Sequence, residues 1–361
     1  MGIQRRVWVF VVVVLRVQPA WATVEVSPSF LGMYRKTMVI ENELLAHTKR
    51  YGVDPRTARA VVLQESGGNA DLVSSAGARG YFQVMPRTFR SLGVRSNIEA
   101  GIKYLAQLHR QFGREDYAIA AYNAGPGTIT KGRPLRVETL QYVIGVGHYK
   151  SVLRQHEPEI RRQAEAIALR RVRKGDTWET LARTTGIPVV FLYVYNPFLA
   201  NRPLQTGALI AHPVVPPLDI VKYDGRHVYY TSRIGDSYLN VAHVFGVDLD
   251  TFRRDNDLWR LQQLPVGLHL RISIPSTSPL RPFLQSVSHV SSRAVAPAKR
   301  KRQDVVPVVR AGGIRTHIVR PGETLTQIAR RYQTTVRALM LANRLGSAHI
   351  QAGAALLIPP G

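Results

Sequence analysis

A single glutamate offers the clearest chemistry in this sequence. An Asp-Pro pair at residues 54–55 is a typical helix start, apolar residues recur over residues 58–63, and a Gly pair at residues 67–68 ends the helix. Glu65 therefore falls in the last turn, where the helix C-terminus and any apolar wall raise the pKa of a carboxyl group. A carboxylic acid that stays protonated near neutral pH can protonate a glycosidic oxygen. For an isolated glutamate, the alternative is a solvated residue at a helix end.

Two further segments accompany Glu65-Ser66 in the order and rough spacing of a known family. Residues 80–86 read Gly-Tyr-Phe-Gln-Val-Met-Pro, and residues 121–125 read Ala-Tyr-Asn-Ala-Gly. Together the three segments resemble the lysozyme-like lytic transglycosylases, particularly the membrane-bound type D branch, which cleave bacterial peptidoglycan. The resemblance implies a mostly α-helical, lysozyme-like (goose-type or SLT) catalytic domain over residues 30–165. Apolar spacing independently predicts helices over residues 39–51 and 98–112, and small residues at 74–84 indicate a bent loop or short β-tongue.

The resemblance also implies roles for individual residues. Glu65 would act first as the general acid and later as the base. The side chains expected to bind or orient substrate are Ser66, Gln83, Met85, Tyr122, Asn123 and Tyr142. Among them, Ser66 would be a hydrogen-bond partner beside Glu65, Gln83 would face the cleft, and Tyr142 would stabilise positive charge at the reacting centre. The implied reaction cleaves the β-1,4 bond between N-acetylmuramic acid and N-acetylglucosamine and leaves 1,6-anhydro-N-acetylmuramyl ends.

The number of carboxylates decides between reaction types. Inverting and retaining hydrolases need a second acid, as base or as nucleophile. A lytic transglycosylase needs one acid, because the 6-hydroxyl of its own substrate attacks intramolecularly with a large effective molarity. The segment Gly68-Asn69-Ala70-Asp71 stands where the family usually has an aromatic residue followed by Asn-Pro, so Asp71 is either a second carboxylate near the site or a surface residue. A lysozyme-type hydrolase and a noncatalytic peptidoglycan-binding scaffold are therefore the alternative functions.

Beyond residue 170 the sequence repeats itself three times. Each copy places a Gly, an acidic residue and a hydroxyl residue between a strand-like run and a helix: Gly175-Asp176-Thr177, Gly235-Asp236-Ser237 and Gly322-Glu323-Thr324. Each copy then has an Asn at the same offset from its Gly, and these residues are Asn196, Asn256 and Asn343. An apolar run ending in Pro closes each copy. The implied unit is strand, helix, helix, strand.

This unit resembles the LysM module, a small βααβ domain that binds N-acetylglucosamine in glycans. The modules are expected at residues 170–214, 226–276 and 315–361, with a flexible basic linker at 277–314, so the fold class is α+β. The nine turn residues would bind glycan through backbone donors and hydroxyls, or would cap helices. The three Asn residues are expected to end the second helix of each copy rather than touch sugar. Weak binding by each module would add up to avidity on a polymer.

The composition of the chain limits the kinds of partner that it is expected to bind. Its 49 Lys and Arg exceed its 24 Asp and Glu, which gives a formal net charge of +25 and attraction to polyanions. Peptidoglycan is the expected partner, with anionic envelope polymers as further ones; no nucleic acid is expected, because no helix-turn-helix, zinc-finger or RNP motif is present. The sequence has no cysteine, which excludes disulfides and thiolate sites. We expect no metal, no cofactor and a monomer.

Residues 1–22 resemble a cleavable signal peptide. The start is basic, an apolar run covers residues 7–15, and Ala-Trp-Ala at residues 20–22 fits a cleavage site. The run is short for a bilayer span and Arg16 interrupts it, so a retained anchor is the alternative. We therefore expect an exported protein of the bacterial periplasm or cell envelope, without a stable membrane span after cleavage.

Overall fold

A computed structural model describes most of the chain between residues 25 and 358. The ranges are 25–200, 202–214, 221–258, 263–285, 315–319, 323–336, 339–340, 343, 350 and 355–358. The expected signal peptide and residues 286–314 of the expected basic linker lie outside the described residues. Linker residues 277–285 are described, and Leu280 and Leu284 among them are buried in the hydrophobic cluster of the two adjoining repeats. The chain divides into two compact units, one of residues 25–301 and another to which residues 302–361 belong. Within the described ranges, no helix combines the length and apolar character needed to cross a bilayer.

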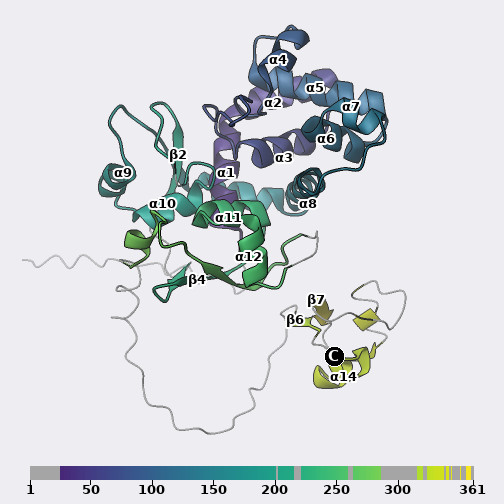
Figure 1. Ribbon diagram of the computed structural model, residues 1–361, viewed down its shortest axis with the longest axis vertical. Helices are drawn as coiled ribbons and strands as arrows, with labels where there is room; N and C mark the ends of the chain where they lie inside the picture. Colours follow the sequence, from purple (N-terminus) through teal and green to yellow (C-terminus); the bar gives the residue numbers. More distant parts are fainter. Residues whose placement is uncertain are drawn as a thin grey trace, which may run out of the picture. The chain divides into compact units, whose positions relative to one another are not determined.

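The N-terminal part of the larger unit is helical. Its elements are α1 (Pro28–Thr37), η1 (Met38–Ile40), α2 (Glu41–Tyr51), α3 (Pro55–Glu65), α4 (Pro86–Leu92), α5 (Asn97–Phe112), α6 (Glu115–Ala124), α7 (Pro126–Thr130) and α8 (Val137–Glu165). Helix α3 packs against α1, α2 and α8, and its residues 57–64 are buried (Figure 1). Between α3 and α4, isolated bridges join Arg79 to Val73 and to Val84. The short β-tongue predicted for residues 74–84 is therefore present.

Two βααβ units follow α8 in the same compact unit. Module 1 comprises β1 (Ile167–Arg171), α9 (Trp178–Thr185), α10 (Val189–Tyr195) and β2 (Leu209–Pro213); module 2 comprises β3 (Lys222–Tyr223), β4 (His227–Thr231), α11 (Tyr238–Phe245), α12 (Leu249–Asp255) and β5 (His269–Ser273). In each, the first and last long strands pair antiparallel, as with Leu169 opposite Ala211 and Tyr229 opposite Arg271. Buried side chains of both modules, Trp178 and Phe245 among them, belong to one hydrophobic cluster. Modules 1 and 2 thus share a core.

The predicted Asn residues have a structural role in both modules. Asn196 donates from Nδ2 to the carbonyls of Leu192 and Ala211, at 2.7 Å each, and its Oδ1 accepts from the Ala211 amide. Asn256 makes the same pattern with Phe252 and Arg271. Each Asn therefore ties the end of the second helix to the last strand, as the sequence predicted.

Module 2 is docked directly onto the N-terminal helices. Val26, just before α1, forms a parallel bridge with Ile234, and the Ser27 hydroxyl donates to Asp236 at 2.6 Å. Gly235 has φ +88°, and a Cβ there would come within 2.4 Å of the Phe30 ring. Its backbone conformation and the close approach of Phe30 both require glycine. Nothing in the local sequence pattern predicted this contact, because it joins residues about 200 positions apart.

The docking corrects one expectation for the second repeat. Gly235, Asp236 and Ser237 were expected to bind glycan, but α1 and α8 cover this turn. Asp236 is 1% exposed, and the Tyr149 hydroxyl lies 3.0 Å from Ser237 Oγ. Protein covers Gly235 and Asp236, so these two residues present no free face to a glycan, whereas Ser237 lines a cavity shared with the N-terminal helices.

The smaller unit contains the third repeat. Its described elements are β6 (Arg315–Ile318), α14 (Leu325–Arg331) and β7 (Ala355–Ile358). The two strands pair antiparallel, with His317 opposite Leu356. A separate cluster of Leu325, Ile328, Leu339 and Ile358 forms its core. This module therefore has the predicted strand and first-helix arrangement and a hydrophobic core of its own.

Candidate active site

Helix α3 places Glu65 at its C-terminal end. Asp54 caps the start of the helix by accepting from the Arg56 amide at 2.8 Å. Beyond the end of the helix, Gly67 and Gly68 have φ of +56° and +78°, conformations that glycine adopts without strain. The chain thus turns away immediately after Glu65. Both ends of this helix follow the signals in the sequence.

The carboxyl group of Glu65 has an unusual acidity. Burial raises its pKa from 4.5 to about 7, because the charged form loses hydration. The Tyr142 hydroxyl opposes this shift by donating to Glu65 Oε1 at 2.6 Å. At neutral pH a large fraction of Glu65 is therefore a protonated acid. This is the state that can donate a proton to a leaving oxygen.

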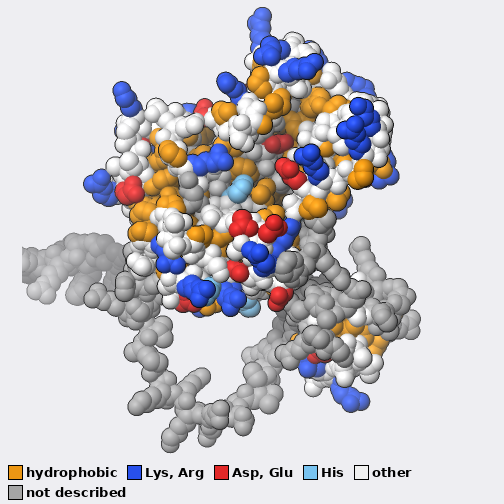
Figure 2. Space-filling model, viewed as in Figure 1, with side chains coloured by type: hydrophobic (Ala, Val, Ile, Leu, Met, Phe, Trp, Pro, Cys, Tyr) orange, Lys and Arg blue, Asp and Glu red, His pale blue; other side chains and the backbone are white. Residues whose placement is uncertain are grey.

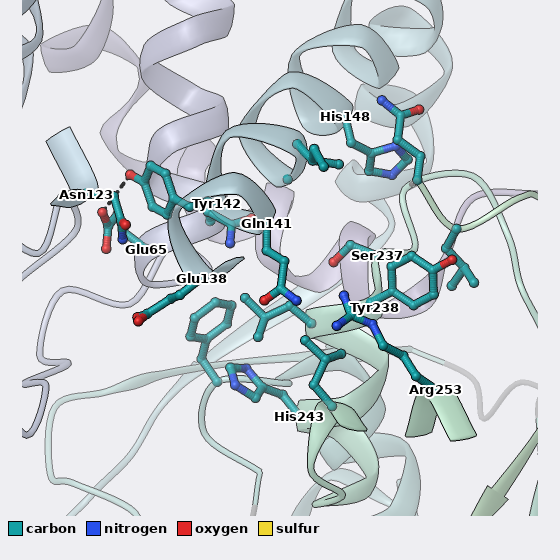
Figure 3. A pocket seen from close by; sticks show the side chains of 18 residues that line it. Glu65, Asn123, Glu138, Gln141, Tyr142, His148, Ser237, Tyr238, His243 and Arg253 are labelled. Atoms are coloured by element: carbon teal, nitrogen blue, oxygen red, sulfur yellow. Dashed lines mark hydrogen bonds between the residues drawn. The ribbon is translucent and has the colours of Figure 1, made fainter. Parts of the chain in front are cut away.

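Asn123 and Tyr142 lie beside Glu65, as the sequence predicted (Figure 3). Asn123 comes from the end of α6 and Tyr142 from the second turn of α8. The Thr139 hydroxyl donates to Asn123 Oδ1 at 2.8 Å. Because this bond engages the amide oxygen, the amide nitrogen is the donor that Asn123 can offer to a ligand. A sugar acetamido carbonyl is a suitable acceptor for it.

Two of the predicted residues support the site from behind. The Ser66 hydroxyl donates to the Tyr81 carbonyl at 2.8 Å, and Ser66 is fully buried. Its hydroxyl therefore anchors the β-tongue to the end of α3, next to Glu65, and makes no hydrogen bond to the Glu65 carboxyl among the described contacts. Gln83, at φ +46°, donates from Nε2 to the carbonyls of Leu72 and Gly80 at 2.8 Å each. Its amide nitrogen thus shapes the tongue rather than pointing into the cleft.

Tyr122 and Met85 were also predicted to contact substrate. Tyr122 donates to the Phe82 carbonyl at 2.8 Å, and its ring packs at 5.3 Å from the ring of Tyr104. It joins α6 to the tongue. Met85 precedes α4 and is 42% exposed. It does not belong to the described residues that line the cavity around Glu65.

That cavity has a volume of ≈ 290 Å³ and two walls of different origin. One wall consists of catalytic-domain residues, including Gln64, Glu65, Asn123, Glu138, Gln141, Tyr142 and His148. The other consists mainly of module 2 residues, including Ser237, Tyr238, His243, Leu249 and Arg253. Figure 3 shows side chains of both walls converging on the same space. Figure 2 shows acidic and histidine side chains around the hollow between the two regions.

Sequence reasoning missed most of these lining residues. Glu138, Gln141 and His148 were missed. They lie on the same face of α8 as Tyr142, which was predicted, so this helix face could have been recognised. The module 2 residues carry no such signal. Their position depends on the docking of module 2, which follows from contacts distant in sequence.

The two other acidic residues considered for catalysis, Glu138 and Asp71, line different cavities. Glu138 is exposed and lines the cavity with Glu65. Asp71 lines a different depression, with Tyr81, Arg171 and Gln205. Asp71 is exposed and does not line the Glu65 cavity, so of the two alternatives for this residue the structure favours the surface one. The described residues include no cluster of three or more His, Asp or Glu side chains that could hold a metal ion.

The turns of the other two repeats cap helices. In module 1, Asp176 accepts from the Arg173 amide at 2.8 Å and Thr177 from the Thr180 amide at 3.2 Å; Gly175, at φ +84°, has open space around it. In the third repeat, Thr324 accepts from the Gln327 amide, while Glu323 bonds His317 and Arg331. Gly322 lies outside the described residues. Capping, which the sequence suggested as the alternative, is present in both.

Comparison with known proteins assigns domains to these regions. Residues 44–136 match the family model of the transglycosylase SLT domain, and residues 171–209 and 317–359 match that of the LysM domain. The chain carries both domains. Module 2 lies between the two LysM matches and has the same order of strands and helices. The SLT match covers Glu65 and Asn123, while Tyr142 follows its end.

Several curated proteins resemble the SLT region. A transglycosylase of Enterobacteria phage PRD1 is 36% identical over 103 residues, which are 26% of this chain and 39% of that protein. The membrane-bound lytic murein transglycosylase F of Stutzerimonas stutzeri is 33% identical over 100 residues, 24% of this chain and 21% of that protein. The matched part of this chain thus covers well under two thirds of the length of these relatives.

A solved structure is also similar to part of this chain. The crystal structure of an inactive mutant of the lytic transglycosylase Slt from Pseudomonas aeruginosa is 31% identical and covers 32% of this chain and 24% of that chain, with a TM-score of 0.29.

Proposed function

We propose that this protein is a lytic transglycosylase of peptidoglycan. The observation that carries the proposal is Glu65, a carboxylic acid with a pKa of about 7 that lies beside Tyr142 and Asn123 in a cavity. The substrate bond would be the β-1,4 linkage between N-acetylmuramic acid and N-acetylglucosamine. The SLT match supports the same class of reaction.

The reaction proceeds in two proton transfers through Glu65. Its carboxylic acid protonates the glycosidic oxygen, the bond from that oxygen to C1 of the muramyl residue breaks, and N-acetylglucosamine leaves with a free 4-hydroxyl. The positive charge at C1 is stabilised by the substrate acetamido group and by the Tyr142 hydroxyl. The muramyl 6-hydroxyl then attacks C1 and gives its proton to the Glu65 carboxylate. This step closes the 1,6-anhydro ring and restores the acid without a water molecule.

A lysozyme-type hydrolase is the second candidate. Glu138 is the specific observation in its favour, because this exposed acid lines the same cavity. In a hydrolase, such an acid would activate a water molecule on the opposite face of the sugar. The products would then be hydrated reducing ends.

The third repeat fits a separate anchoring role. Residues 302–361 belong to a different compact unit from the catalytic domain, and residues 317–359 match the LysM domain. We propose that this unit holds the enzyme on peptidoglycan, and that module 1 adds a weaker contact through its open Gly175 turn. Anionic envelope polymers are further partners for a chain of net charge +25. Export to the periplasm or cell envelope and a monomeric state complete the proposal.

Mass spectrometry of the soluble fragments released from purified peptidoglycan tests these alternatives. The transglycosylase releases anhydro-muramyl products, each lighter by one water than a hydrolase product, and Glu65→Gln releases none. Glu138→Gln is the matched control, because it removes the other lining acid. Hydrated products that disappear in Glu138→Gln would establish the hydrolase. Retention on peptidoglycan without any release by the parent would favour a noncatalytic scaffold.

A further inference from the structure

The cavity that contains Glu65 also contains a cation supplied by module 2. Arg253 lies on α12, and its guanidinium stands over the Tyr238 ring at 5.5 Å from the centroid. When the side-chain amide of Gln141 is oriented with its oxygen toward Arg253, this oxygen accepts from Arg253 Nη1 at 2.7 Å and from Nη2 at 2.8 Å. The Tyr238 ring against its face and the Gln141 amide oxygen at its edge thus fix the plane of the guanidinium group. Figure 3 shows Arg253 beside Tyr238 in the half of the cavity away from Glu65.

The guanidinium keeps binding capacity in this position. Two of its five N–H groups reach Gln141, and its buried Nε has no acceptor among the residues that the structure describes. Because Nε is buried, the donors left for an incoming acceptor are the second N–H groups of Nη1 and Nη2. A planar anion such as a carboxylate fits the remaining donors, since guanidinium groups bind carboxylates in a bidentate manner.

The other titratable groups of the cavity do not compete with Arg253 for this role. Burial lowers the pKa of His148, and burial together with Arg202 lowers that of His243 to about 4, so both rings are neutral at pH 7. Glu65 keeps its proton in about half of the molecules there, and neither of its forms carries positive charge. Glu138 is exposed at the Glu65 end of the cavity (Figure 3). Within the described lining, Arg253 is therefore the residue that carries positive charge at neutral pH.

We propose that Arg253 and Tyr238 form a subsite for a carboxylate of the peptide stem carried by the muramyl residue. This inference rests on the proposed function, because the stem is an acidic substituent of that substrate. Module 2 then serves as a fixed wall of the substrate cleft rather than as a tether to the cell wall. The docking contacts at Ser27–Asp236 and Tyr149–Ser237 hold this wall in place.

Equilibrium binding to Glu65→Gln separates this subsite from catalysis. The ligands are soluble disaccharide-peptide fragments of peptidoglycan with their stem carboxyl groups either free or amidated, measured by calorimetry. The free-carboxyl fragment should bind at least about tenfold more tightly than the amidated one. Adding Arg253→Gln should abolish this difference, whereas Arg253→Lys should keep part of it through its point charge. Arg254→Gln is the matched control, because Arg254 lies next on the same helix, is exposed and bonds Thr251.

Turnover gives a second readout of the subsite. The ratio of kcat/KM on peptide-bearing strands to kcat/KM on strands stripped of their stems should fall in Arg253→Gln and stay unchanged in Arg254→Gln. Equal affinity for the two fragments, or a difference that survives Arg253→Gln with thermal unfolding intact, would overturn the subsite. A parent protein that cleaves neither substrate would instead refute the proposed function. The binding experiment would still decide whether the carboxylate subsite exists.

Discussion

The hydroxyl of Tyr142 donates a 2.6 Å hydrogen bond to Oε1 of Glu65, across 77 positions of the sequence. Because Oε1 accepts this bond, the proton of the neutral acid resides on the other carboxyl oxygen. The bond therefore selects which oxygen delivers the proton. It also joins the end of α3 to α8, so the acid and the tyrosine are positioned by one contact.

The pH dependence of cleavage should report the acid form of Glu65. With a pKa of about 7, Glu65 loses its proton as the pH rises through 7, and kcat/KM should fall over that range. Tyr142→Phe removes a bond that lowers this pKa, so the falling limb should move to higher pH. The maximal rate should drop by about 10- to 100-fold, since a charge-stabilising hydroxyl is lost. Tyr51→Phe, which loses a bond to Glu99 on α5, is a control whose profile should match the parent. A limb that stays in place in Tyr142→Phe would contradict the assignment.

Protein stability should also fall as Glu65 loses its proton. The folded pKa of Glu65 lies above its unfolded value of 4.5, so stability is greatest below pH 4.5 and is lost as the pH rises to about 7. Glu65→Gln has no proton to lose at this position. Its free energy of unfolding should exceed that of the parent by up to about 3 kcal/mol at pH 8 and equal it near pH 4. Urea unfolding at the two pH values measures this difference. The variant should have lost cleavage by about 100-fold or more at every pH.

Two equivalent glycines test the docking of module 2. Gly235 and Gly175 have similar positive φ values, +88° and +84°, but only a Cβ at Gly235 would meet Phe30, at 2.4 Å. Both Gly→Ala variants incur backbone strain. Gly235→Ala should lower the free energy of unfolding by about 1–3 kcal/mol more than Gly175→Ala, because it overpacks the interface. Denaturant titrations of both variants provide the comparison. Equal losses would mean that the Gly235 contact does not hold module 2 in place.

Removal of residues 302–361 should separate anchoring from catalysis. The remaining residues contain the whole described cavity and the shared core of modules 1 and 2. Retention on insoluble peptidoglycan should fall by about tenfold or more as one binding module is lost. The melting temperature and the turnover of soluble fragments should remain those of the parent. Retention unchanged by the deletion would assign wall binding to another part of the chain.

Local signals in the sequence predicted much of the catalytic helix. The cap at Asp54, the apolar face of α3 and the Gly67-Gly68 stop together located Glu65 and the direction of its pKa shift. These features depend on neighbours within a few residues. The positions of Asn123 and Tyr142 beside Glu65 agreed with the family resemblance, which encodes contacts that local patterns do not.

The sequence did not predict the hydrogen bonds of Ser66 and Gln83, because each side chain has several possible partners nearby. In the structure both donate to backbone carbonyl groups of the β-tongue. The glycan-binding prediction for the turn of the second repeat differs from the structure for another reason. Its Gly-Asp-Ser turn has the same local pattern as the first repeat, yet it is buried because residues 26–30 occupy it. Repeat patterns specify the fold of a module but not which of its faces another domain covers.

A single residue, Ala166, separates the end of α8 from the start of β1. The polypeptide therefore offers no hinge at the point where sequence comparison would divide enzyme from repeats. A fragment that stops at residue 165 would uncover Phe30 and lose the Arg253 wall of its cavity. The N-terminal helices and both adjoining repeats are consequently expected to keep their fold only when they are expressed together, as one cooperative unit.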